Sequence, residues 1–230
     1  MRWRPGNTTV ESVKPSPPRS EGTSPVPPDP VDWSARYAAE DTPWDNGAPH
    51  PELSLALQDG RLAPPHEGAR VFVPGAGRGH DAIALARRGW VVTAVDVVES
   101  LVAEVAPQLE KLGGTFVVGD ALEIGEAQEF DLIWDHTFFC AIQPRDRARW
   151  GKQAARILKP AGHYAALVFP VGKPVEDGGP PFGMSCEALM QALGPLFRER
   201  VSEPVSRPLK RRTWQEFWLR AEKTGLAPAQ

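Results

Sequence analysis

The feature that most constrains the fold is a regular alternation of short apolar runs and helix-forming segments. The predicted strands are 70–74, 90–96, 115–120, 129–136 and 163–170, and the predicted helices are 80–89, 99–113 and 144–159. Because the strands are apolar throughout, both faces of their sheet must be covered. The pattern therefore predicts an α/β, Rossmann-like fold with a mostly parallel sheet and helices on both faces.

The C-terminal part continues this pattern less regularly. We expect one more helix at 186–194 and two last strands at 196–201 and 217–222, which would form an antiparallel edge. Pro107 lies inside the second predicted helix and is expected to kink or split it. The basic cluster KRRTW, which begins at Lys210, is typical of a solvated surface stretch.

The N-terminal 30 residues differ in composition from the rest of the chain. They contain eight prolines and few sizeable apolar side chains, so they cannot bury enough surface to offset the entropy of ordering. We expect a disordered tail at 1–30 and one domain at 31–230, since 230 residues suit a single core.

Composition excludes several classes of partner. The formal charge is −3, from 26 basic and 29 acidic side chains, which does not indicate a nucleic-acid or membrane-surface protein. No apolar run is long enough to span a bilayer, and Cys140 and Cys186 lack metal-ligand spacing. We expect a cytoplasmic monomer that takes a small-molecule partner and binds no metal, nucleic acid or membrane.

The turn between the first predicted strand and helix contains Gly75, Gly77 and Gly79. Glycines at such a turn let a ligand approach the backbone at a helix N-terminus, although a plain structural turn is the alternative. Nicotinamide or flavin dinucleotides and S-adenosylmethionine (SAM) are both bound in this way. In either case an acid at the end of the second strand, here Asp96, holds the ribose hydroxyls. Position 80 is His where the dinucleotide pattern requires Gly, which favours SAM.

Asp120 ends the third predicted strand. Its carboxylate could receive the adenine amino group of a bound cofactor. The same residue could instead cap the turn that follows, and the two interpretations remain open.

Four blocks of the sequence resemble the thiopurine methyltransferase superfamily, in particular its thiol and halide methyltransferase branch. They are WSARYAAEDTPWDNG (33–47), VFVPGAGRGHDAIALARRGWVVTAVD (71–96), FDLIWDHTFFCAI (130–142) and LVFPV with DGGPPF (167–182). The resemblance implies a class I methyltransferase with a seven-stranded sheet and with SAM at the carboxyl ends of the strands. It also implies that an N-terminal segment, 31–66, folds over the site as a lid.

The resemblance also implies site residues. The cofactor contacts would be Trp33, Tyr37, Trp44, Gly75, Gly77, Asp96, Asp120, Ala121 and His136. The plant-type enzymes are similar but carry Tyr at the positions of His136 and Phe169, which face the transferring methyl group. His136 and Phe169 are therefore the candidate catalytic residues, and the acceptor of this chain could differ from theirs.

The chemistry that the resemblance implies is methyl transfer from SAM to a small thiol, sulfide or similar soft nucleophile. His136 could accept a thiol proton, or it could only hydrogen-bond the cofactor or backbone. Phe138 and Phe139 could line a dry acceptor wall or belong to the core, and Cys140 is expected to serve packing. The alternatives are methylation of halide, thiocyanate or selenium or tellurium oxyanions. A nicotinamide-dependent oxidoreductase and a non-catalytic SAM-binding protein are further alternatives.

Overall fold

The computed structural model describes residues 31–225, and the chain divides into two units, Met1–Val31 and Asp32–Gln230. The expected disorder of 1–30 lies outside the described residues. All the helices and strands below belong to the second unit.

The second unit is built on one seven-stranded sheet in the order β3-β2-β1-β4-β5-β7-β6. The strands are β1 Arg70–Pro74, β2 Val91–Asp96, β3 Thr115–Val118, β4 Phe130–His136, β5 Leu158–Val171, β6 Phe197–Pro204 and β7 Gln215–Lys223. The first five are parallel, whereas β7 runs antiparallel to both β5 and β6. The predicted mostly parallel sheet and its antiparallel edge are both confirmed.

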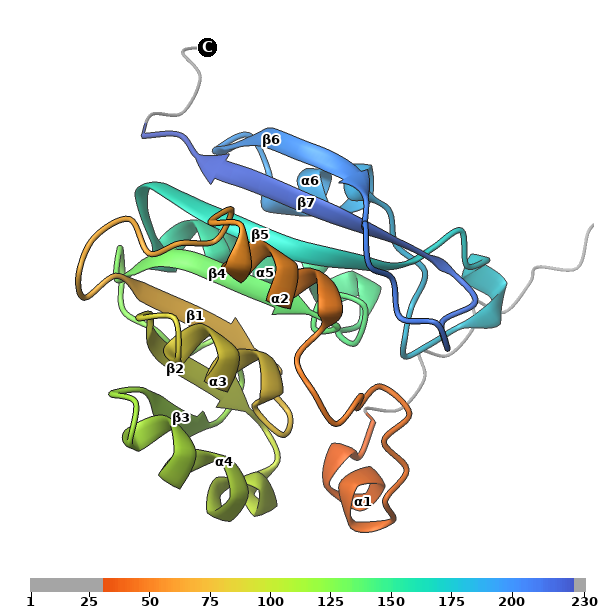
Figure 1. Ribbon diagram of the computed structural model, residues 1–230. Helices are drawn as coiled ribbons and strands as arrows, with labels where there is room; N and C mark the ends of the chain where they lie inside the picture. The colour runs from red at the N-terminus through yellow and green to blue at the C-terminus, as the bar shows by residue number, and fades with distance from the viewer. Residues whose placement is uncertain (1–30, 226–230) are drawn as a thin grey trace, which may run out of the picture. The chain divides into compact units, whose positions relative to one another are not determined.

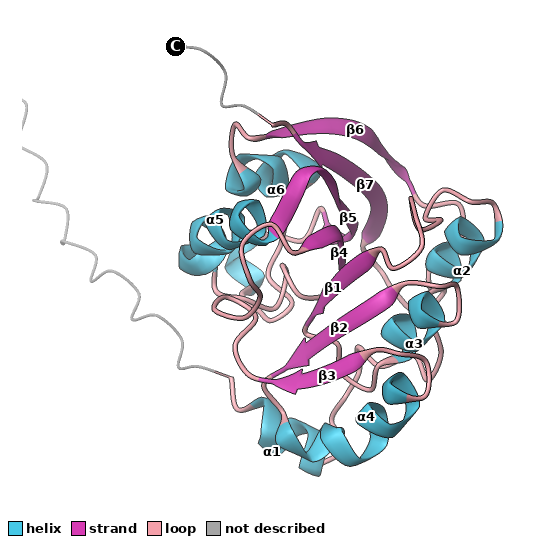
Figure 2. Ribbon diagram, turned by 90° about the vertical axis from the view of Figure 1, so that its left-hand side faces the viewer, coloured by secondary structure: helices cyan, strands magenta, loops and turns pink. Residues whose placement is uncertain are grey.

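Helices cover both faces of this sheet (Figure 2). They are α2 Pro51–Gln58, α3 His80–Ala86, α4 Val102–Glu110, α5 Arg147–Ile157 and α6 Cys186–Leu193, whereas the short helix α1 Trp33–Ala38 lies beyond the ends of the strands (Figure 1). Side chains alternate between the faces along each strand. In β1, Val71 and Val73 pack in a core cluster with α2, α3 and α4, whereas Phe72 packs in a second cluster with α5 and α6.

Three local features differ from the sequence-based expectation. The helix α4 runs unbroken through Pro107, so the predicted split is wrong. The helix α5 ends at Ile157, earlier than predicted, because Leu158 already pairs with Phe130 at the start of β5. The unpredicted α2 places Leu53 in the core, so the second half of the expected lid segment is core structure.

The strand order reverses between β1 and β4, since the chain runs outward from β1 to β3 on one side and from β4 onward on the other. Open α/β sheets bind ligands at the carboxyl ends of the strands beside such a reversal. The glycine turn follows β1 at this point, and Thr137 follows β4. Helix α1 lies beyond the same ends of the strands (Figure 1). In the described part of the chain, no helix is long and apolar enough to cross a membrane.

Candidate functional site

The glycine turn after β1 requires its glycines. Gly75, Gly77 and Gly79 have φ values of 56°, 54° and 72°, in the left-handed region that disfavours other residues. A Cβ at Gly77 would lie 2.7 Å from the hydroxyl oxygen of Tyr37. The turn therefore has both the conformation and the close overhead packing that only glycine permits.

Asp96, at the end of β2, is hydrogen-bonded to the backbone of the glycine turn. Its Oδ2 accepts the N–H of Gly77 at 2.8 Å, and its Oδ1 accepts the N–H of Val98 at 3.1 Å. Burial raises the pKa of Asp96, against the effect of the backbone N–H groups that it accepts. A carboxylate has about four acceptor sites, so this side chain keeps acceptor capacity for a ribose hydroxyl.

The opening segment, which we define as residues 32–47, lies over the turn. The indole N–H of Trp44 donates to the Tyr37 hydroxyl at 3.2 Å, and the Trp33 and Trp44 rings meet edge to face at 5.3 Å. The Arg36 guanidinium covers Trp44 at 4.4 Å. Burial raises the pKa of Tyr37 to about 12, so its hydroxyl is neutral at ordinary pH.

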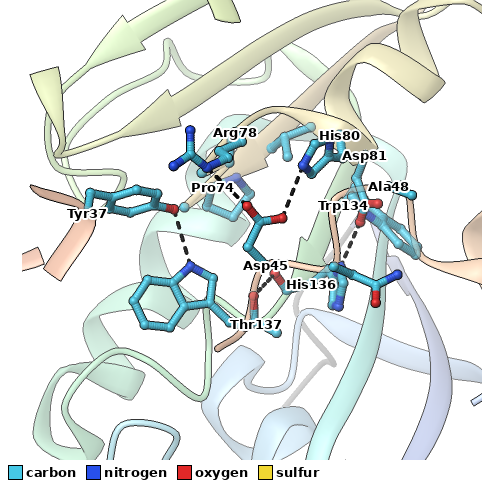
Figure 3. Close-up of a pocket in the computed structure, with 16 residues that line it drawn as sticks. Tyr37, Asp45, Ala48, Pro74, Arg78, His80, Asp81, Trp134, His136 and Thr137 are labelled. Carbon is cyan, nitrogen blue, oxygen red and sulfur yellow. Dashed lines mark hydrogen bonds and ion pairs between the residues drawn. The ribbon is translucent and has the colours of Figure 1, made fainter. Parts of the chain in front are cut away.

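Asp45 fastens this segment to the turn. Its carboxylate pairs with Arg78 at 3.0 Å and with His80 at 3.1 Å, as Figure 3 shows. The Arg211 guanidinium also donates to the Asp45 carbonyl at 2.7 Å. Sequence reasoning missed Asp45, although it directly follows Trp44 in the opening block.

A cleft lies between the opening segment, the glycine turn and the end of β4 (Figure 3). Five of the residues predicted to contact a cofactor line it, namely Tyr37, Trp44, Gly75, Gly77 and His136. These residues come from three separate parts of the sequence. The fold brings them together because β1 and β4 are neighbours in the sheet.

The other predicted site residues are not among those that line this cleft. Trp33 packs against Trp44, and Asp96 lies beneath the turn. Asp120 is exposed and accepts the N–H of Leu122 at 2.9 Å, which is the geometry of the capping alternative. Ala121 is buried. The Phe169 ring lies beneath the Arg212 guanidinium at 4.1 Å.

His136, the last residue of β4, is hydrogen-bonded at both ring nitrogens. Nδ1 lies 2.8 Å from the Asp81 carboxylate, and Nε2 lies 3.0 Å from a guanidinium nitrogen of Arg212. Asp81 also accepts the indole N–H of Trp134 and the backbone N–H of His50, each at 2.9 Å. Burial raises the pKa of Asp81, but His136 and these hydrogen bonds outweigh it and lower the pKa to about 2.

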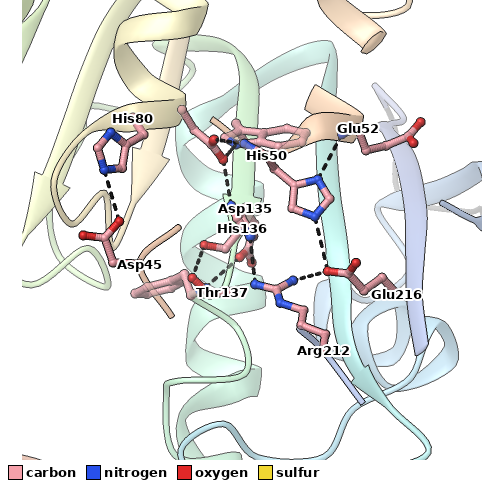
Figure 4. Close-up of polar contacts among 12 residues, drawn as sticks. Asp45, His50, Glu52, His80, Asp135, His136, Thr137, Arg212 and Glu216 are labelled. Atoms are coloured by element: carbon pink, nitrogen blue, oxygen red, sulfur yellow. Dashed lines mark hydrogen bonds and ion pairs between the residues drawn. The ribbon is translucent and has the colours of Figure 1, made fainter. Parts of the chain in front are cut away.

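A second set of buried contacts continues from Arg212 (Figure 4). Arg212 pairs with Glu216, which also lies 3.3 Å from Nε2 of His50. Although burial opposes it, the contacts with His50 and Arg212 lower the pKa of Glu216 to about 2. The Arg212 side chain is only 7% exposed, so the expectation of a solvated basic stretch is wrong for this residue.

The loop after β4 is held by the buried carboxylate of Asp135. This side chain accepts the Tyr164 hydroxyl at 2.5 Å and the N–H of Phe138 at 3.1 Å. Phe139 and Cys140 are buried in the core cluster beside α5. Burial raises the pKa of Cys140 to about 12, so its thiol is not a nucleophile at neutral pH.

The residues that sequence reasoning missed are charged groups whose partners are distant in the chain. Arg212 is 76 positions from His136, and Glu216 is 166 positions from His50. The only local signal is the spacing of Arg212 and Glu216, which are four residues apart.

Comparison with known proteins identifies the family to which the chain belongs. The profile of the "Thiopurine S-methyltransferase (TPMT)" family matches residues 29–221. A probable thiol methyltransferase 2 of Arabidopsis thaliana is 33% identical over 174 residues, which is 74% of each chain. Thiocyanate methyltransferase 1 of the same plant is 35% identical over 176 residues, again 74% of each chain.

Solved structures agree on the fold. A 1,6-didemethyltoxoflavin-N1-methyltransferase of Burkholderia thailandensis, crystallised with S-adenosylhomocysteine, superposes with a TM-score of 0.66 at 24% identity. The match covers 84% of this chain and 86% of that one. The family match, the shared fold and the glycine turn above Asp96 together place the chain in the thiopurine S-methyltransferase family of SAM-dependent methyltransferases.

Proposed function

We propose that the chain transfers the methyl group of SAM to a small thiol, hydrosulfide or similar soft sulfur nucleophile. The observation that carries the proposal is the cleft between the glycine turn and His136, which the opening segment covers. A covered cleft of this kind suits a small acceptor better than a macromolecule. The thiol and thiocyanate methyltransferases that this chain resembles support the choice of sulfur.

The residues around the cleft would divide the work as follows. SAM supplies a methyl group that is already activated by its sulfonium, so the protein needs to orient it and exclude water. Asp96 would accept the ribose hydroxyls, and the turn at Gly75 and Gly77 would bring backbone close to the cofactor. Asp120 and Ala121, at the end of the neighbouring strand β3, are proposed to contact the adenine.

The acceptor side would be formed by His136 and Phe169. A sulfur lone pair forms the new bond to the methyl carbon while the bond from that carbon to the sulfonium sulfur breaks. This leaves S-adenosylhomocysteine and a methylated acceptor. The opening segment, residues 32–47, is proposed as the lid, with Asp45 holding it closed.

Thiocyanate and halide are the second candidate acceptors. The observation that favours them is the similarity of this chain to thiocyanate methyltransferase 1 of Arabidopsis thaliana, which is 35% identical over 176 residues.

The oligomeric state, the class of acceptor and the cellular compartment are also proposals. We propose a monomer, as expected from the sequence. The formal charge of −3 supports a small-molecule acceptor over nucleic acid. Both cysteines are thiols, which supports the reducing cytoplasm.

The test is an acceptor panel with purified protein and SAM, followed by S-adenosylhomocysteine release. The panel contains hydrosulfide, an alkyl thiol, an aromatic thiol, thiocyanate and iodide. We expect release with the sulfur acceptors and its loss in Asp96→Ala, which removes the ribose contact. Release with iodide alone would refute the thiol assignment, and no release despite SAM binding would refute the proposed activity.

A further inference from the structure

Five buried or half-buried side chains form a continuous polar network that begins at the wall of the cleft, and Figure 4 labels four of them, namely His50, His136, Arg212 and Glu216. In order of contact they are Asp81, His136, Arg212, Glu216 and His50. The polar network forms a closed ring, because the backbone N–H of His50 donates to Asp81. It joins α3, β4, β7 and the segment before α2, and His136 is its only member in the candidate catalytic set.

The hydrogen bonds assign the proton on the His136 ring. A guanidinium has only donors, so its 3.0 Å contact with Nε2 requires that Nε2 present a lone pair. The ring proton must then be on Nδ1, which donates it to Asp81 at 2.8 Å. In this arrangement His136 is neutral, and its only basic lone pair is occupied by Arg212.

The surrounding groups hold this arrangement in place. His50 meets the His136 ring edge to face at 5.0 Å and is itself neutral, because its Nδ1 accepts the N–H of Glu52. Glu216 fixes the other end of the Arg212 guanidinium. A second proton on His136 would have to displace Arg212 and would then place two positive charges side by side.

Arg212 also contacts the second candidate catalytic residue. Its guanidinium lies 4.1 Å from the ring centre of Phe169. The two candidate catalytic residues, His136 and Phe169, therefore both contact Arg212.

On the basis of the proposed function, we propose that Arg212 is a positioning residue. It occupies Nε2 of His136, so this histidine does not accept the proton of a thiol acceptor. The enzyme then methylates only acceptors that reach the cleft already ionised. Iodide, thiocyanate and hydrosulfide ions meet this condition. An alkyl thiol meets it only in the fraction that has lost its proton to water, and the electron pair of that thiolate forms the bond to the methyl carbon.

The first test reads the tautomer without using activity. In ¹⁵N-histidine-labelled protein, with the His136 signals assigned by their loss in His136→Phe, we expect a protonated Nδ1 and an unprotonated Nε2 from pH 6 to 8. A protonated Nε2, or a doubly protonated ring in this range, would overturn the proposal.

The second test is the pH profile of kcat/KM. For 2-mercaptoethanol it should rise about tenfold per pH unit throughout the range below the pKa of this thiol, because only the thiolate reacts, while the value for iodide stays within about twofold. If the thiol profile instead levels off near pH 6.5 and His136→Phe abolishes this levelling, His136 is a base and the proposal is wrong.

Variants of Arg212 complete the test. Replacing both partners, Arg212→Met with Glu216→Gln, leaves no unpaired buried charge and frees Nε2. At pH 6.5 the ratio of thiol to iodide turnover should then rise about tenfold or more, because a free base can take the thiol proton. Arg212→Lys keeps a charged donor at this place and should preserve the wild-type ratio.

An unchanged ratio in the double variant would overturn the role of Arg212. The proposed function fails in a different way, since it would show no S-adenosylhomocysteine with any acceptor. In that case the ¹⁵N spectra still decide the state of His136.

Discussion

Replacing Gly77 with alanine tests whether the glycine turn is the cofactor cradle. The added Cβ would lie 2.7 Å from the Tyr37 hydroxyl oxygen, at a residue whose φ is 54°. Gly113→Ala is the matched control, because Gly113 also has a positive φ, 75°, but has no neighbour within 4 Å of the new Cβ.

Both variants lose stability because the new alanine is left-handed, and only Gly77→Ala also loses stability through a steric contact. A left-handed alanine costs about 1–2 kcal/mol, partly offset by the stiffer unfolded chain, so both should lower the free energy of unfolding by about 1 kcal/mol. Only Gly77→Ala displaces Tyr37 and disrupts its hydrogen bond to Trp44, which costs about a further 1 kcal/mol. If SAM binds against this turn, its Kd should rise about fivefold to tenfold or more in Gly77→Ala.

The assay is titration calorimetry with SAM on the wild type and both variants, with urea unfolding as the stability control. We expect weaker SAM binding in Gly77→Ala and wild-type binding in Gly113→Ala. If Gly77→Ala binds SAM within twofold of the wild type, the assignment of the turn is refuted.

Three further predictions follow from the polar contacts. Asp45→Asn should speed SAM dissociation about threefold to fivefold in stopped-flow measurements, because the partly exposed ion pair of Asp45 with Arg78 contributes less than about 1 kcal/mol. An unchanged dissociation rate would contradict the lid role. Cys140→Ala should keep kcat within about twofold and lower the unfolding free energy by about 1 kcal/mol, and loss of turnover would contradict a packing role. The pKa of Glu216 is about 2 in the fold and about 4 when unfolded, so its stabilisation is complete above pH 4 and is lost as the pH falls toward 2. Acid unfolding should therefore be shallower in Glu216→Gln, and an unaltered slope would count against this linkage.

The architecture could be predicted because its signal is local. The apolar runs at 70–74 and 129–136 correspond to β1 and β4, and the glycine turn stands where β1 ends. Even the antiparallel edge could be predicted from 196–201 and 217–222. The helix α2 was missed because its eight residues are short for a periodic pattern and its burial depends on the sheet beneath it.

The site could be predicted only in part, for a physical reason. Tyr37, Trp44 and Gly77, which are expected from the sequence to contact the cofactor, all line the cleft, since their motifs are compact in sequence. The burial of Arg212 depends on partners supplied by β4 and β7, whereas a run of basic residues is ordinarily solvated. Charged networks of this kind become visible only when distant strands are placed side by side.

The most direct test of the account is to follow the methyl group itself. Protein incubated with SAM labelled with ¹³C in the methyl group, together with hydrosulfide, should release ¹³C-methanethiol in equal amount to S-adenosylhomocysteine. Bound SAM without any ¹³C-methylated product, from hydrosulfide or from the other sulfur acceptors, would contradict the account.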